Sequence, residues 1–181
     1  MIEITSRNVG RIAERIVANE LEARGFRVSD LNKDGIAANA DLVAISLSKT
    51  LQIQVKGATN GPKDRYPWVG YGYLSKETLS GDEPVFNRRK SFYKANTVIL
   101  VALRSLTQYT CFVLPIDVAQ RAAQLHVAAY RDRGWKPGPT HLTLEPGPRA
   151  RESDPRITEE RELLALYRDE QGWERLLQSN P

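Results

Sequence analysis

The apolar run Thr97–Leu103 constrains the fold most, because all but its first residue are hydrophobic. A strand of this composition shows no alternation of apolar and polar residues, so it belongs inside a sheet that is covered on both faces. A second apolar run follows at 109–116. Since helices are the usual cover for such a sheet, the chain predicts an α/β fold with a central mixed β-sheet flanked by helices.

Three segments carry the helical repeat that would provide this cover. In 7–24, apolar residues recur every three or four positions, and Gly25 ends the pattern. The segment 115–134 opens with proline and aspartate near its first turn, which favours a second helix. We expect a last helix at 157–177, where an apolar cluster around Trp173 would dock it on the body of the protein or on a second subunit.

Three strands are predicted between the first helix and the apolar run, at 26–32, 41–47 and 51–57. The last two lie so close in sequence that they predict a hairpin closed by the two residues Ser48 and Lys49. The order of elements is then a helix, a three-stranded meander, two further strands and a helix. The segment that follows, rich in glycine and proline, contains one more short candidate strand.

The predicted hairpin brings three different polar head groups together. Its expected pairs are Leu47 with Thr50, Val43 with Gln54, and Asp41 with Lys56. Because side chains alternate along a strand, Gln54 and Lys56 project to one face, and this register adds Asp41 to that face. A carboxylate that binds Mg²⁺ beside an ammonium that offsets negative charge suits phosphodiester hydrolysis.

The spacing of these residues resembles the PD-(D/E)xK nuclease superfamily, in which an acid ending one strand is followed on the next strand by an acid, one residue and a lysine. The matching pieces are Asp41 and the run Gln54-Val55-Lys56. The leading helix of many members, written Gly, three residues, Glu, then Leu and Gly, is matched by Gly10, Glu14, Leu21 and Gly25. Ala40 stands where the family has proline. Gln54 replaces the second acid, which is similar to the Mrr-like restriction endonuclease branch.

The resemblance implies a restriction-endonuclease-like core and an Mg²⁺-dependent DNA endonuclease, with Mn²⁺ as an alternative ion. Asp41, Gln54 and Glu14 would hold the metal. Lys56 would orient the attacking water and offset charge in the transition state, and cleavage would leave a 5′ phosphate. Glu20 lies nearer the centre of the apolar helix face and competes with Glu14 for the helix position.

The length of 181 residues fits a single domain over 1–181, with a core at about 7–132 and an extension at 133–181 that carries the C-terminal helix. The segment 58–95 is longer than ordinary loops and interleaves aromatic with basic residues. Aromatic rings stack on bases and cations track phosphates, so this insertion predicts DNA contacts. The residues expected to make them are Lys63, Arg65, Arg88, Arg89 and Lys90. The alternative is an ordinary insertion whose aromatics pack on the body.

Several classes of site are excluded or disfavoured. The single cysteine, Cys111, cannot form an internal disulfide or a cysteine-based zinc site, and we expect it to be buried in a strand. His126 and His141 lack a metal-ligand partner at helical spacing, which favours structural roles. No apolar run approaches the roughly 20 residues that cross a bilayer, and no leader is apparent, so a cytoplasmic protein is expected. The net charge of +4 favours a polyanionic partner.

Two other functions fit the same sequence. The first is a nucleic-acid-binding module of the same fold whose metal site has decayed through Gln54. The second is a protein–protein interaction domain that uses the aromatic insertion and the last helix, which could also join two copies as a homodimer. Metal-dependent cleavage separates the endonuclease from the first alternative, and salt-insensitive association without DNA affinity indicates the second.

Overall fold

The computed structural model describes residues 8–31, 40–59, 65–69, 95–132, 140–143 and 154–178; for 65–69, 130–131 and 140–143 it describes the backbone alone. The elements are α1 (Val9–Ala23), β1 (Arg27–Asp30), β2 (Leu42–Ile45), β3 (Thr50–Thr59), β4 (Arg65–Val69), β5 (Thr97–Leu103), β6 (Tyr109–Pro115), α2 (Ile116–Asp132), β7 (Thr140–Thr143), α3 (Pro155–Ala165) and α4 (Asp169–Gln178). In this described part of the chain, no helix has the length and apolar character needed to cross a membrane.

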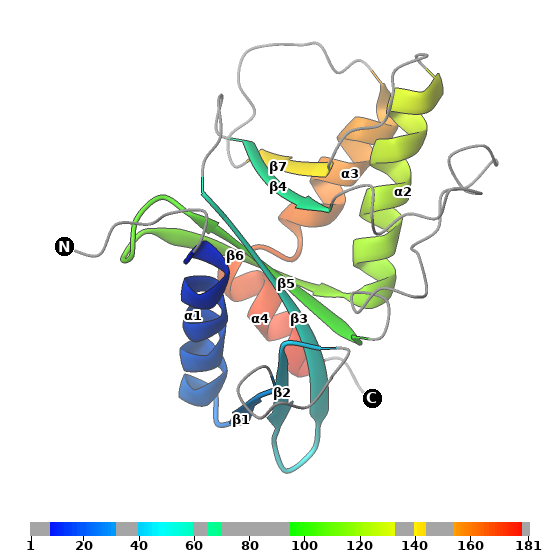
Figure 1. Ribbon diagram of the computed structural model, residues 1–181. Coiled ribbons are helices and arrows are strands. Elements are labelled where there is room, and N and C mark those ends of the chain that lie inside the picture. Colours follow the sequence, from blue (N-terminus) through cyan, green and yellow to red (C-terminus); the bar gives the residue numbers. More distant parts are fainter. Residues whose placement is uncertain are drawn as a thin grey trace.

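Five of the described strands form one sheet in the order β1-β2-β3-β5-β6 (Figure 1). Strands β3 and β5 run parallel, whereas the other neighbours run antiparallel, so the sheet is mixed as predicted. Strand β5 lies between β3 and β6, and every one of its residues is buried. The expectation that the apolar run is an internal strand covered on both faces is confirmed.

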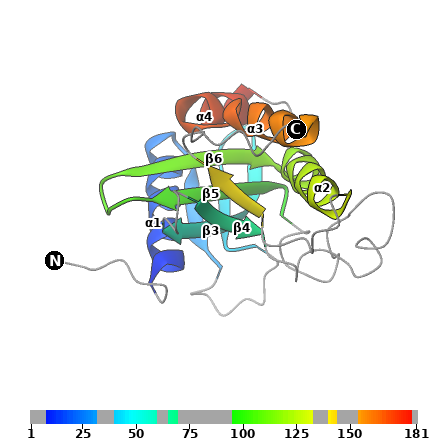
Figure 2. The same ribbon diagram turned by 90° about the horizontal axis from the view of Figure 1, so that it is seen from above.

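Helices cover both faces of this sheet, with α1 and α2 on opposite sides (Figure 2). On one face, α1 and α4 pack against Leu51, Ile53 and Val55 of β3. On the other face, α2 and α3 pack against Val98 and Leu100 of β5. Because α3 and α4 contribute to the two opposite clusters, the C-terminal segment completes the core on both sides of the sheet.

The β2–β3 hairpin has a longer turn than the sequence predicts. Ile45 pairs with Thr50, and the four residues between them form the turn, in which the Ser46 N–H donates to the Lys49 carbonyl at 2.9 Å. The predicted pairs Leu47–Thr50, Val43–Gln54 and Asp41–Lys56 are therefore wrong by two residues. A shift of two keeps each side chain on its predicted face. The Lys49 ammonium donates to the Leu176 carbonyl of α4 at 2.5 Å, a tertiary contact that holds the turn.

The C-terminal segment forms two helices, so the prediction of a single helix over 157–177 is wrong. Between α3 and α4 the chain turns at Asp169, whose φ of +46° lies in the left-handed region. The Val113 N–H of β6 donates to the Tyr167 carbonyl at 2.9 Å, and the Cys111 N–H donates to the Asp169 carboxylate at 2.9 Å. The break thus supplies hydrogen-bond acceptors to the edge strand β6, where a continuous helix would leave these amides unpaired.

Helix α4 docks on the body of the protein, which was one of the two predicted alternatives. Trp173 and Leu176 are buried in the α1-side cluster, whereas Leu177 remains partly exposed. The guanidinium of Arg24, the residue that caps the C-terminal end of α1, lies 4.7 Å from the centre of the Trp173 ring, a cation–π contact that links the two helices.

The segment 58–95 is not a loop throughout. Strand β3 continues to Thr59, and β4 begins at Arg65, so the expected loop starts too early and contains a missed strand. Strand β4 pairs antiparallel with β7, the short strand predicted near His141, and β7 lies beside α2 (Figure 1). The pairing partner comes from more than seventy residues further along the chain, which is why local sequence patterns did not reveal β4.

Two buried titratable residues have the structural surroundings that the sequence predicts. Cys111 is 2% exposed in β6. Burial, followed by the charge of Glu20, raises the pKa of its thiol to about 12. His126 of α2 is buried against α3, with its Nδ1 3.0 Å from an Oε2 oxygen of Glu160. This pair joins the two helices on the α2 side of the sheet.

Candidate active site

Asp41 lies immediately before β2 and extends the β2–β3 pairing by one residue. Its N–H donates to the Ile53 carbonyl at 2.8 Å, and its own carbonyl accepts from Leu31 at 3.1 Å. The Asp41 carboxylate accepts the Val55 N–H at 2.7 Å and a hydrogen bond from the Gln54 side-chain amide. Asp41 is therefore level with Gln54, two positions from the predicted partner Lys56, and remains on the predicted face.

Gln54 is buried in the middle of β3, with 2% of its surface exposed. Its Nε2 donates to Asp41, which fixes the orientation of the amide. The Oε1 oxygen is buried and has no hydrogen-bond partner within the described part of the chain. A buried acceptor without a hydrogen bond costs about 1–3 kcal/mol of stability. A cation or a hydrogen-bond donor that binds to Gln54 Oε1 would therefore stabilise the protein.

Lys56 follows Gln54 by two residues, so both side chains project from the same face of β3. Strand β2 begins at Leu42, which pairs with Ile53, whereas β3 continues to Thr59. Beyond Ile53, the β2-side edge of β3 thus has no strand partner among the described residues. The Asp41 carboxylate occupies the first position of this open edge, and Lys56 is half-buried just beyond it.

Glu14 projects from α1, the helix that covers the opposite face of the sheet. Burial raises the pKa of Glu14 above its usual value, and the carboxylates of Asp41 and Asp30 raise it further. The ammonium of Lys56 and the guanidinium of Arg11 lower the same pKa. The charges of Asp41 and Lys56 both act on Glu14, although Glu14 comes from the helix on the other face of the sheet. The open edge of β3 therefore lets charged side chains from the two faces interact.

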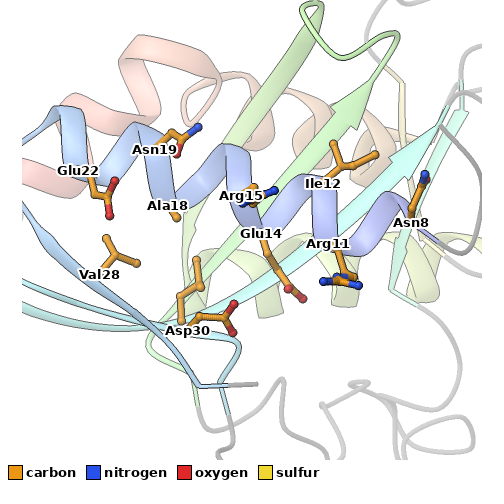
Figure 3. A pocket seen from close by; sticks show the side chains of 11 residues that line it. Asn8, Arg11, Ile12, Glu14, Arg15, Ala18, Asn19, Glu22, Val28 and Asp30 are labelled. Atoms are coloured by element: carbon orange, nitrogen blue, oxygen red, sulfur yellow. The ribbon is translucent and has the colours of Figure 1, made fainter. Parts of the chain in front are cut away.

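Glu14 also lines an open cavity of about 450 Å³ formed by α1 with β1 and β2. Figure 3 shows Glu14 and Asp30 pointing into the same space, with Arg11 and Arg15 along the helix. Sequence reasoning missed Asp30. The signal that could have found it is the alternation in β1, where Asp30 shares its face with Val28 and so is directed toward α1.

Glu20, the competing helix carboxylate, takes part in a different set of contacts. It pairs with Arg24 one turn later and accepts the Tyr109 hydroxyl at 2.9 Å. Burial, followed by the hydrogen bond to Glu20, raises the pKa of Tyr109 to about 12. Arg24 also pairs with Glu170 at 2.7 Å, so the network ties α1 to β6 and α4. These contacts favour a structural role for Glu20 and leave Glu14 as the helix carboxylate near Asp41.

The residues at the open edge of β3 fit an oxygen-seeking cation such as Mg²⁺. No group of three or more His, Cys, Asp and Glu side chains among the described residues could hold a metal ion by itself. Mg²⁺, however, commonly binds through one or two carboxylates and completes its shell with water and substrate phosphate. The Asp41 carboxylate and the Gln54 Oε1, which has no partner in the part of the chain that the structure describes, are oxygens of the required type.

The predicted DNA contacts in the insertion cannot be placed relative to this site. Lys63, Arg88, Arg89 and Lys90 lie outside the described residues, and of Arg65 only the backbone at the start of β4 is described. These five assignments stay predictions.

No protein-family model matches the sequence, and the search of curated proteins finds no match. Among solved structures, the bacterial homing endonuclease I-Ssp6803I is similar at 20% identity and a TM-score of 0.53, over 97% of this chain and 95% of that one. The two chains share a fold. MepB is similar at 12% identity over 86% of this chain and 94% of that one, but its TM-score of 0.34 carries no structural argument.

Proposed function

We propose that the protein is an Mg²⁺-dependent DNA endonuclease, with Mn²⁺ as an alternative ion, and that the open edge of β3 is its active site. The observation that carries the proposal is the buried Gln54 Oε1, which has no hydrogen-bond partner among the described residues. The amide of the same side chain contacts the Asp41 carboxylate, and Lys56 follows on the same face. The fold shared with a homing endonuclease supports the same class of reaction. Glu14 would complete the site from α1.

In this proposal Asp41 and Gln54 hold the metal through their oxygens, and Glu14 adds charge from the helix. The bound ion would polarise the scissile phosphate and lower the pKa of water. Lys56 orients the attacking water by hydrogen bonding and offsets the negative charge that builds up on the phosphate oxygens. Attack on phosphorus breaks the bond to the 3′ oxygen, which takes up a proton as the attacking water loses one. The products are a 5′ phosphate and a 3′ hydroxyl.

The hydrogen bond from the Val55 N–H fixes the position of the Asp41 carboxylate. A backbone amide cannot rotate away as a side chain does, so it holds one Asp41 oxygen in place at the edge of β3. Such preorganisation matters because hydrolysis depends on placing the charged groups before the reaction begins.

Lys56→Ala tests the proposal on linear, circular and branched DNA, each with Mg²⁺, with Mn²⁺ and with a chelator. We expect the wild type to cleave only with a divalent ion and Lys56→Ala to lose at least about 100-fold in rate, the usual cost of removing one transition-state stabiliser. Thr50→Ala changes an exposed residue of the same strand and serves as the matched control. Circular dichroism checks that each variant folds.

Equal cleavage by the wild type and Lys56→Ala would refute the role of Lys56. DNA binding without cleavage under any ion would instead indicate the non-catalytic nucleic-acid-binding module. Absence of both binding and cleavage would favour the interaction domain.

A further inference from the structure

The cavity beside Glu14 contains two cations that the proposed chemistry does not use. Arg11 and Arg15 are exposed on α1 and line this cavity. Neither guanidinium donates a hydrogen bond or forms an ion pair with another described residue. Residues four apart lie on the same side of a helix, about 6 Å apart along its axis. The two cations therefore form a short basic track that starts next to Glu14.

The beginning of α1 adds to this positive potential. The first turn of the helix contains no acidic residue, so the positive end of the helix dipole is not neutralised locally. Gly10, in that turn, is exposed, and a Cβ added there would meet no atom of the described residues within 4 Å. Glycine in a helix costs about 0.5–1 kcal/mol relative to alanine, and packing against the described residues does not explain it here. A residue without a side chain does allow the backbone of another molecule to approach closely.

The cavity contains carboxylates as well as the two arginines. Figure 3 shows Arg11 and Arg15 on the part of α1 nearer its start, Asp30 on β1 across from Glu14, and Glu22 further along the helix. A phosphate would be attracted to the two guanidinium groups and repelled by the carboxylates of Asp30 and Glu22. These charges favour an anionic chain that runs along the exposed start of α1 and does not enter the cavity as far as Asp30 and Glu22.

We propose that Arg11 and Arg15, together with the exposed start of α1 at Gly10, bind the phosphates of a DNA strand that continues from the site at Asp41 and Lys56. Guanidinium groups match the geometry of phosphate oxygens and bind them in a bidentate manner. Their spacing of about 6 Å along the helix lets the two guanidinium groups contact different phosphates of one strand. This inference depends on the proposed function for the direction of the strand, but its binding test does not depend on cleavage.

The test measures binding of a fluorescently labelled 20-base-pair duplex by anisotropy at several salt concentrations, with a chelator present to prevent cleavage. In the double variant Arg11→Gln/Arg15→Gln, the slope of log K against log salt should become shallower by about 2, because each lost phosphate contact removes about 0.9. Arg27→Gln is the control: it makes the same substitution, removing one positive charge, at an exposed residue of β1 that does not line the cavity. Its slope should equal that of the wild type.

A second variant, Gly10→Glu, places negative charge on the proposed path of the strand. It should weaken DNA binding at least about tenfold at low salt, with a melting temperature close to that of the wild type, since none of the described residues packs on Gly10. An unchanged slope in the double variant, or a wild type that does not bind the duplex, would overturn the inference. If cleavage in Mg²⁺ persists while the slope is unchanged, the proposed function survives and only the strand path is wrong. If the slope changes but no ion supports cleavage, the strand path survives and the endonuclease proposal fails.

Discussion

Gly57 on β3 is the residue at which the packing of α1 can be tested most directly. A Cβ added to Gly57 would lie 2.6 Å from the Ala13 Cβ and 2.8 Å from the Val9 carbonyl oxygen. Both atoms are fixed to the helix backbone, so a rotamer change cannot relieve the contacts. To reach an ordinary separation of 3.4 Å or more, α1 must move away from β3 by roughly 1 Å, which fits the range of overpacking effects.

We expect Gly57→Ala to lose about 1–3 kcal/mol of unfolding free energy, the usual cost of inserting a methyl group into a filled interface. For a chain of this size, each kcal/mol lowers the melting temperature by about 2–4 °C. The same displacement would carry Glu14, the residue after Ala13, away from Asp41 and Lys56. Since misplacement by about 1 Å can reduce a rate by about 100-fold, the variant should lose cleavage activity even at temperatures where it remains folded.

Chemical denaturation measures the stability change, and Gly10→Ala is the matched control because its added Cβ meets nothing within 4 Å. That control should be as stable as the wild type or up to about 1 kcal/mol more stable, since alanine favours helix. Ala13→Gly removes one of the two contacts, so combining it with Gly57→Ala should show a favourable coupling energy in a double-mutant cycle. A Gly57→Ala protein as stable as the wild type would refute the close contact between α1 and β3.

Three further predictions concern buried groups. Gln54→Glu replaces the amide that donates to Asp41 with a second carboxylate, so the free energy of unfolding of the metal-free protein should fall by about 1–3 kcal/mol. Mg²⁺ should raise the melting temperature of this variant more than that of the wild type. Loss of all response to metal would show that residue 54 is not a ligand. Burial raises the pKa of Glu160 above 4.5 although the facing His126 lowers it. The folded state then holds this proton more tightly than the unfolded state, so the wild type should lose stability relative to Glu160→Gln as the pH rises above 4.5. A constant difference in urea midpoints between pH 4.5 and 7 would contradict this. Cys111, buried and with its pKa raised to about 12, should react with a thiol reagent at pH 7 only at the rate of unfolding, and rapid labelling of the native protein would refute its burial.

The elements that sequence reasoning located best are those whose signal is local. The apolar run that became β5 and the periodic pattern that became α1 each depend on neighbours within a few positions. The faces of the hairpin were also predicted correctly, because strand alternation depends on parity alone. Its register was not, because Lys49 contacts Leu176, a residue far away in the sequence, and the turn lengthens to four residues.

The candidate site divides in the same way. Asp41, Gln54 and Lys56 were predicted to share one face, and the structure places them there, while their catalytic roles stay proposals. Asp30 was missed because its relation to Glu14 arises only when β1 packs beneath α1. The break between α3 and α4 was missed for a similar reason, since the unpaired edge of β6 requires the carbonyl of Tyr167.

By itself, the sequence determined the elements with a local pattern, such as α1 and β5, and which polar side chains share a face of β3, because both follow from repeats of two or 3.6 residues, or from continuous apolar runs, along the chain. Only the tertiary structure decided how far β2 extends along β3. The end of β2 leaves the open edge at which Asp41 accepts a hydrogen bond from Gln54 and its charge acts on Glu14. The physical reason is that this edge depends on contacts among α1, α4 and the sheet, each between residues distant in sequence. Their free energies add up only when the whole core has formed.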